Sequence, residues 1–238
     1  MQTQRKSVPP SINEAMIERH FALDPTTRET LHDPALTQLR DAVQAARVGA
    51  EKARRVADAI LRNDMLTVPA RHRQVKGETW RAVEGALRKL DAARSAAAQE
   101  VRAIEARTKA PPRPTDPAGA MLASEIRARL ASMPPAARRK AMDGALADGD
   151  DTVLGAVLNG PPMLSGLSGS EEFEMVRSSW QRSRHGDDID RLSRLSRALV
   201  DSERAGTLVI GFMVGLYSSK AIEQAEATEQ AVATALQS

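Results

Sequence analysis

The chain has 238 residues, enough for one large domain or two modest ones, each with its own buried core. It contains no cysteine, which excludes disulfides, thiolate metal sites and a cysteine nucleophile, and only 3% of its residues are aromatic, which favours thin helical hairpins and bundles over a sheet-based enzyme core. Its 34 Lys and Arg nearly balance its 31 Asp and Glu, so the distribution of charge is more informative than the total.

The N-terminal arm, residues 1–32, is expected to hold one short helix. No apolar stretch follows the first two cations of the arm, so no secretory signal is expected. Ser11 and Glu14 have the spacing of a capping box, in which each side chain satisfies a free backbone amide of the other residue. This spacing predicts a short helix that runs through Ile17.

A long heptad helix is expected to start at Pro34. Asp33 has the chemistry of an N-cap, and proline is well tolerated in a first helical turn. Apolar residues then recur at alternating spacings of three and four, which is typical of a coiled-coil seam. This first seam comprises Leu36, Leu39, Val43, Ala46, Ala50, Ala53, Ala57 and Ile60.

The heptad register resumes after a connection around residues 63–76 that contains Pro69. This second seam comprises Trp80, Val83, Leu87, Leu90, Arg94, Ala97, Val101 and Ile104. Two such helices in tandem predict a long antiparallel, coiled-coil-like hairpin over residues 33–107. Arg94 either sets register and oligomer state or extends its charged end out of the seam, and we prefer the second interpretation.

Four prolines between Arg107 and Gly119 predict a semi-extended linker at residues 108–118. We expect a C-terminal bundle of shorter helices after it, in a domain of residues 119–238. One helix of this domain is expected to start at Ser132, with Pro134 and Pro135 in its first turn, and to stop at Gly149. Further helix starts are expected at Asp150 or Asp151, at a capping box of Ser168 and Glu171, and at Asp187 or Asp188.

The last segment is expected to form one helix from Gly206 to about Leu236. Its first part, up to Tyr217, is apolar on all sides, so it must be enclosed in a core or in an oligomer contact. Twelve residues at 1.5 Å per residue reach roughly 18 Å, short of the roughly 30 Å of a bilayer core, so no transmembrane helix is expected. Gly211 and Gly215 would allow another helix to approach this segment closely.

The two ends of the chain carry opposite charge. Residues 34–107 contain 15 basic and 9 acidic residues, a net +6, whereas residues 187–238 contain 5 basic and 8 acidic residues, a net −3. We therefore expect the two ends to bind different partners or each other. Insertion into a membrane surface is disfavoured, because Lys220 is the only cation near the apolar run.

No catalytic or cofactor motif is found. The four histidines, at positions 20, 32, 72 and 185, are far apart and form no pair with helical metal-binding spacing. The sequence lacks a phosphate-binding loop, a dinucleotide glycine fingerprint, a zincin motif and a nucleophile elbow. We therefore expect no metal, no cofactor and no enzymatic activity.

Two aspartate clusters could bind a divalent cation. They are Asp148, Asp150 and Asp151, and Asp187, Asp188 and Asp190. The first has its glycine at the wrong offset for a calcium loop and lacks the terminal glutamate, whose place is taken by Asn159. Helix capping explains both clusters better.

Three groups of basic residues leave a nucleic-acid-binding alternative open, since phosphate backbones need several cations on one surface. They are Arg71, Arg73 and Lys76; Arg138, Arg139 and Lys140; and Arg182 and Arg184. Trp80 and Trp180 lie near two of the groups, but each falls on an apolar stripe, which favours core packing over base stacking. A solvated surface of mixed charge is the simpler interpretation.

The stretch 125–167 reads EIRARLASMPPAARRKAMDGALADGDDTVLGAVLNGPPMLSGL and resembles a segment of small helical proteins encoded by tailed bacteriophages and prophages. The later stretch DIDRLSRLSRALVDSERAGTLVIGF is similar to the same group. The resemblance covers the C-terminal half. It implies a virion or assembly component, located in the particle or in the cytoplasm of a bacterial host.

The leading hypothesis is therefore a non-enzymatic structural or assembly protein that makes homo- or hetero-oligomeric contacts with virion proteins. A nucleic-acid-associated packaging or regulatory protein is the alternative, and an enzyme ranks third. The residues expected at the oligomer contact come from both seams and from the apolar C-terminal run: Leu36, Leu39, Val43, Ile60, Trp80, Leu87, Leu90, Gly211, Phe212 and Gly215.

Overall fold

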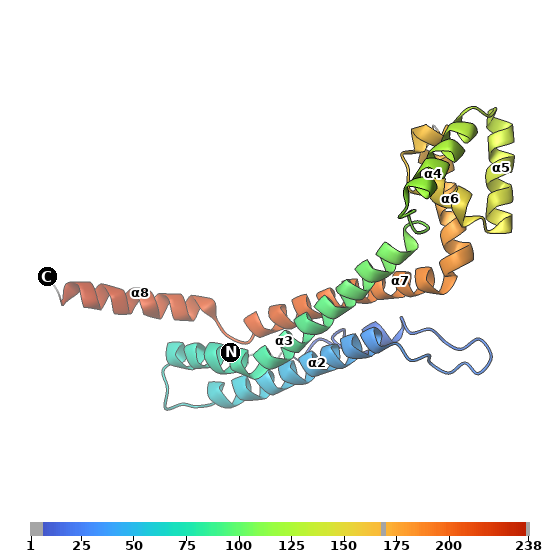
Figure 1. Cartoon of the computed structure of the whole chain (residues 1–238). Helices are drawn as coiled ribbons and strands as arrows, with labels where there is room; N and C mark the ends of the chain where they lie inside the picture. Colours follow the sequence, from blue (N-terminus) through green and yellow to red (C-terminus); the bar gives the residue numbers. More distant parts are fainter. Residues whose placement is uncertain (1–6, 168–169, 237–238) are drawn as a thin grey trace. The chain divides into compact units, whose positions relative to one another are not determined.

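The computed structural model describes residues 7–167 and 170–236 and is built from α-helices (Figure 1). Within these ranges it contains eight α-helices, one 3-10 turn, η1, and no strand beyond an isolated bridge between Leu23 and Thr30, so the expected all-α class is confirmed. The elements are α1 (Ala15–Glu18), α2 (Pro34–Leu61), α3 (Val68–Thr108), α4 (Pro117–Ala131), α5 (Pro135–Asp148), α6 (Asp151–Leu158), η1 (Pro162–Ser165), α7 (Ser170–Val214) and α8 (Ser219–Ala235).

The chain forms two compact units. Unit 1 comprises residues 1–100 and 194–238, and unit 2 comprises residues 101–193. The divisions fall inside α3 and α7, so each of these long helices contributes to both units. The segmentation expected from the sequence instead follows the prolines near residues 108–118.

Helix α2 of unit 1 begins where its capping chemistry predicts. The Asp33 carboxylate accepts hydrogen bonds from the amides of Ala35 (3.0 Å) and Leu36 (3.3 Å), and Pro34 occupies the first turn. Seven of the eight first-seam residues are buried, and only Ile60 is half-buried. Burying one leucine in this way is worth about 2 kcal/mol, so the seam is a main source of stability for unit 1.

Helix α3 contacts α2 in this unit. A methyl group at Gly49 of α2 would lie 3.3 Å from the side chains of Val83 and Ala86 of α3, and Arg71 of α3 donates to the Leu61 carbonyl at the end of α2 (2.9 Å). A coiled-coil geometry for the pair stays a prediction.

The second seam is buried less regularly than the first. Four of its eight positions are buried and four are half-buried, while Val75 and Thr79, outside the seam, are fully buried. An α-helix of 41 residues has 3.6 residues per turn, so its buried face drifts away from a strict seven-residue repeat.

The N-terminal arm packs on α2 through apolar residues. Ile12 and Ile17 are completely buried, and α1 contacts α2. The predicted capping box of Ser11 and Glu14 is wrong: the helix begins only at Ala15, and Glu14 makes no side-chain cap. Glu14 instead lies 3.4 Å from the guanidinium of Arg47 in α2.

The predicted single C-terminal helix is also wrong. Helix α7 ends at Val214, four residues follow, and α8 starts with the Ser218 hydroxyl accepting from the Ala221 amide (3.3 Å). The two helices meet at an angle of 49°. In the described part of the chain, no one helix is both long and apolar enough to cross a membrane, and α7 and α8 meet the length and composition criteria only as a bent pair.

Unit 2 packs α4, α5, α6, η1 and the first part of α7 around one core. Its centre includes Leu130, Met142, Leu154, Val157 and Trp180. Helix α5 ends at Gly149 as expected, with glycine in the left-handed conformation that other residues rarely adopt (φ 63°).

The proline-rich segment is held within unit 2. Asn159 donates to the carbonyl of Pro111, and Gln181 donates to that of Thr108, both at 2.8 Å. Pro111 itself is buried. The residues between α3 and α4 are therefore non-helical, as expected for a proline-rich linker, and part of the segment packs against the rest of unit 2.

Helix α7 contains one non-helical residue, His185 (φ −135°, ψ 31°). Two helices join across a kink at this residue, so a helix begins next to the start expected at Asp187 or Asp188. The Asp188 carboxylate binds the guanidinium of Arg107 (2.6 Å). The other predicted capping box depends on Ser168, which is outside the described residues.

Candidate interaction surface

The C-terminal part of α7 exposes an apolar face to solvent. Three branched aliphatic side chains lie on one side of the helix and are 66% (Val200), 46% (Ile210) and 47% (Val214) exposed. Thr207, which lies between them at helical spacing, and Gly211 are also exposed. We call this set, together with the exposed Glu203, the outer face of α7.

The opposite side of the same helix is buried in unit 1. It comprises Leu195, Ala198, Ala205, Val209 and Met213, each completely buried, and Phe212 is 7% exposed. The chain itself therefore encloses one side of this apolar segment and leaves the outer face in water. Enclosure of the outer face by an oligomer contact stays a prediction.

Unpaired arginines border the outer face. Arg197 and Arg204 are exposed, and neither guanidinium makes a hydrogen bond or ion pair with any residue of the ranges 7–167 and 170–236. Glu203 lies 3.5 Å from the guanidinium of Arg94 in α3. The charges beside the outer face that lack a partner in the described structure are thus positive.

Helix α8 is almost entirely solvated. Of its 17 residues only Ile222 is buried, while Val232 is 54% exposed. Three glutamates and Lys220 give it a net charge of −2. Glu229 contacts Arg73 at 3.2 Å, whereas Glu223 and Glu226 have no ion-pair partner in the described part of the chain.

Most of the seam residues expected at an oligomer contact are covered by the chain itself. Leu36, Leu39, Val43, Leu90 and Phe212 are at most 7% exposed, so another chain could reach them only if unit 1 opened. Their assignment to an oligomer contact is wrong for this reason. The half-buried members of the set are Ile60, Trp80, Leu87 and Gly215, and only Gly211 is exposed.

Gly211 makes no close intramolecular contact. A methyl group placed on it would have no atom within 4 Å. Of the two contacts that Gly211 and Gly215 could allow, close packing within the chain's own core is therefore not made at Gly211, and a contact with another chain stays a prediction. A glycine inside a helix destabilises it by about 1 kcal/mol relative to alanine.

The basic group on α3 is mostly engaged within unit 1. Arg71 binds the end of α2 and lies 3.4 Å from Asp64, and Arg73 binds Glu229. The Lys76 ammonium lies 6.0 Å from the centre of the Tyr217 ring. Only Lys76 of the three therefore lacks a carboxylate partner in the described structure.

The basic group on α5 does not form one exposed surface. Arg138 is buried (9% exposed) and packs against Gly166, and Arg139 binds Glu172 at 3.2 Å. Lys140 is exposed. These residues belong to unit 2, whereas the basic group on α3 belongs to unit 1.

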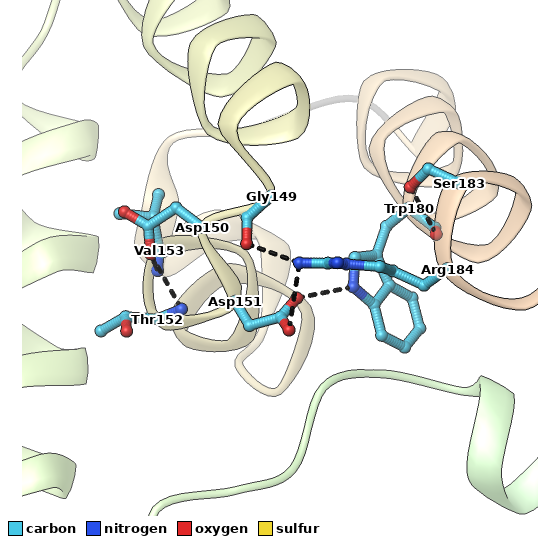
Figure 2. A network of polar contacts seen from close by, with 8 residues as sticks. All are labelled: Gly149, Asp150, Asp151, Thr152, Val153, Trp180, Ser183 and Arg184. Carbon is cyan, nitrogen blue, oxygen red and sulfur yellow. Dashed lines mark hydrogen bonds and ion pairs between the residues drawn. The ribbon is translucent and has the colours of Figure 1, made fainter.

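The aspartates at the start of α6 cap and fasten that helix (Figure 2). Asp150 accepts from the amides of Thr152 (3.0 Å) and Val153 (3.1 Å), which confirms the capping interpretation for this residue. Within the described ranges no three His, Asp or Glu side chains are grouped so as to hold a metal ion.

The neighbouring Asp151 joins α6 to α7. Its carboxylate accepts from the Trp180 indole (3.1 Å) and lies 3.5 Å from the Arg184 guanidinium, which also donates to the Gly149 carbonyl (2.7 Å) (Figure 2). Trp180 is 3% exposed, so its predicted core position is confirmed. Trp80, by contrast, is only half-buried.

A buried charge cluster that the sequence did not reveal ties the N-terminal arm to α7. Asp201 is 9% exposed, and its carboxylate lies 2.6 Å from both the Arg19 guanidinium and Nε2 of His20. Burial opposes ionisation, but the hydrogen bonds from Arg19 and His20 outweigh it and lower the pKa of Asp201 below its usual value.

This cluster has the structure of a clamp and lacks the parts of a catalytic triad. The neighbouring Ser202 hydroxyl donates to the Leu199 carbonyl (2.7 Å) and does not contact His20. The only signal in the sequence was a charged residue on the apolar face of a helix.

Comparison with protein-family models, with curated proteins and with solved structures found no match for this chain.

Proposed function

We propose that this chain is a non-enzymatic structural or assembly protein that works by binding other protein chains through the outer face of α7. Burying a fully exposed valine or isoleucine side chain is worth roughly 1.5 to 3 kcal/mol. Val200, Ile210 and Val214 therefore provide a driving force for association, which the chain's own fold leaves unused. This exposed apolar face is the observation that carries the proposal.

The setting that we propose is a phage or prophage particle, or its assembly in the host cell. The support is the resemblance of residues 125–167 and of the later stretch around α7 to helical proteins of tailed phages. The later stretch includes Val200 and Ile210, so the resemblance and the exposed face fall on the same helix.

A nucleic-acid-associated role has weaker support. Of the six candidate residues on α3 and α5, four are ion-paired or buried in the described structure: Arg71, Arg73, Arg138 and Arg139. Phosphate binding would have to break those contacts first, which offsets part of the electrostatic gain.

The oligomeric state of the full chain tests the proposal. We expect light scattering after size-exclusion chromatography to show self-association that rises with concentration, and Ile210→Glu to abolish it, because a charge would then be buried at the contact. Val48→Glu is the matched control, since Val48 on α2 is 50% exposed and lies outside the face. A wild-type chain that stays monomeric up to about 100 µM has no self-contact stronger than roughly −5.5 kcal/mol, and this result would contradict the proposal.

A further inference from the structure

We propose that the occupant of the outer face of α7 is helix α8 of a second copy of this chain. This inference rests on the proposed function and names its partner. It is carried by three features of unit 1: the lengths of the two surfaces, their apolar patterns and their charges.

The two surfaces match in length. From Val200 to Val214 the outer face covers fourteen residue steps, which is about 21 Å at the helical rise. Helix α8 has 17 residues and is about 25 Å long. One α8 helix can therefore cover the whole outer face.

The apolar residues of α8 form a stripe that its own chain leaves open. Ala225 is half-buried. Val232, seven residues after Ala225, is 54% exposed, and Leu236, four residues after Val232, is 81% exposed. Isolated helices of about 15 residues are marginal in water, so a helix with one buried residue gains stability when a partner covers this stripe.

The charges of the two surfaces are complementary. Arg197 and Arg204 beside the outer face have no partner in the described structure, and neither does Glu226, which lies about 100° around α8 from Ala225 and so beside the stripe. A helix of net charge −2 brought against two free guanidinium groups is attracted to them, whereas two outer faces brought together would place like charges side by side. The charges thus favour an α7–α8 contact over an α7–α7 contact.

The course of the chain excludes the α8 helix of the same copy. A helix can pack on the helix before it only if the chain reverses direction by nearly 180° between them. The bend between α7 and α8 is 49°, so α8 continues away from the α7 of its own chain. Gly211 fits this arrangement, because the absence of a side chain lets a partner helix approach the backbone.

Mixing two full-length variants tests the proposal. The first, Ile210→Glu with Val214→Glu, loses the outer face but keeps α8, and the second, Val232→Glu with Leu236→Glu, keeps the outer face but loses the α8 stripe. All four positions are exposed, so we expect both variants to keep the wild-type helical content by circular dichroism. Each variant alone should associate at least about tenfold more weakly than the wild type.

An equimolar mixture of the two should form a 1:1 complex, because it contains one intact outer face and one intact α8. If the wild type associates but the mixture stays monomeric, or if the second variant associates alone as the wild type does, the α7–α8 pairing is overturned and the proposed function stands. If the wild type does not associate, both are overturned.

Charge reversal gives a second, independent measurement. Arg197→Glu with Arg204→Glu should weaken association, as should Glu226→Arg, and both effects should shrink at 1 M salt, where charges are screened within about 3 Å. An equimolar mixture of these two variants restores one complementary pair and should associate more tightly than either alone. Failure of this rescue at low salt would overturn the proposed charge pairing.

Discussion

Replacement of Asp201 by asparagine should destabilise unit 1 by about 2 kcal/mol at pH 7. The carboxylate is 9% exposed, and a hydrogen bond to a charged group contributes roughly 1.5 to 3 kcal/mol. The His20 side chain is 11% exposed, so its hydrogen bond to Asp201 is expected to contribute within this whole range. The Arg19 side chain is 59% exposed, so its ion pair with Asp201 is worth at most about 1 kcal/mol. Asparagine has the same shape as aspartate and keeps one oxygen that can accept a hydrogen bond. The expected loss of stability is therefore near the lower end of the sum of the His20 and Arg19 contributions.

The effect should depend on pH in a defined direction. The folded-state pKa of Asp201 is lowered, whereas in the unfolded chain it returns to its ordinary value of 3.8. A carboxylate whose pKa is lower in the folded than in the unfolded state stabilises the fold. This stabilisation is complete when the pH is above the pKa of the unfolded state, and it is lost as the pH falls through the pKa of the folded state. The difference between wild type and Asp201→Asn should therefore shrink as the pH falls below 3.8.

Urea unfolding followed by far-ultraviolet circular dichroism at several pH values measures this difference. Glu18→Gln is the control, because Glu18 is exposed, precedes Arg19 and has no ion-pair partner in the described structure, so its replacement should change stability by less than about 0.5 kcal/mol. A loss at pH 7 no larger than that of the control, or a difference that grows as the pH falls below 3.8, would refute the clamp.

Three further predictions concern the core, the unit 2 network and nucleic acid. Gly85→Ala should raise the free energy of unfolding by about 0.5 to 1 kcal/mol, because a methyl group at this position would have no atom within 4 Å. Gly49→Leu should lower it by about 1 to 3 kcal/mol, because even a single methyl group at Gly49 would lie 3.3 Å from Ala86. Equal effects of the two substitutions in urea unfolding would disprove this α2–α3 contact. Trp180→Phe should lower stability by about 1 kcal/mol through loss of the bond to Asp151, and an unchanged thermal midpoint would count against it. Fluorescence anisotropy should detect no binding to a DNA duplex at 50 mM salt, and a dissociation constant below about 10⁻⁶ M that rises steeply with salt would revive the nucleic-acid alternative.

Features set by neighbouring residues could be predicted from the sequence. The Asp33 cap, the glycine end of α5 at Gly149 and the Asp150 cap all follow from bonds between groups a few residues apart. The first seam could also be predicted, because small apolar residues at heptad spacing form one face of any helix, whatever covers it.

Which apolar surface is covered was decided by tertiary packing. Phe212 and Ile210 are two residues apart on one apolar helix, yet only the side that carries Phe212 meets the rest of unit 1. Periodicity assigns residues to a face but does not say which helix, if any, lies against it. Periodicity therefore does not distinguish the seam leucines, which the chain itself buries, from the outer face of α7, which it leaves in water.

The same distinction applies to the polar groups. His20 and Asp201 are 181 residues apart, and no local rule pairs them. The break between α7 and α8 also lacks a proline, so composition alone predicts one continuous helix. The sequence by itself determined the helical class, several helix ends and the apolar stripes, because these depend on short-range bonds and spacing. Only the tertiary structure decided which stripes are buried and which charges meet, because those depend on surfaces that the chain brings together over long sequence separations.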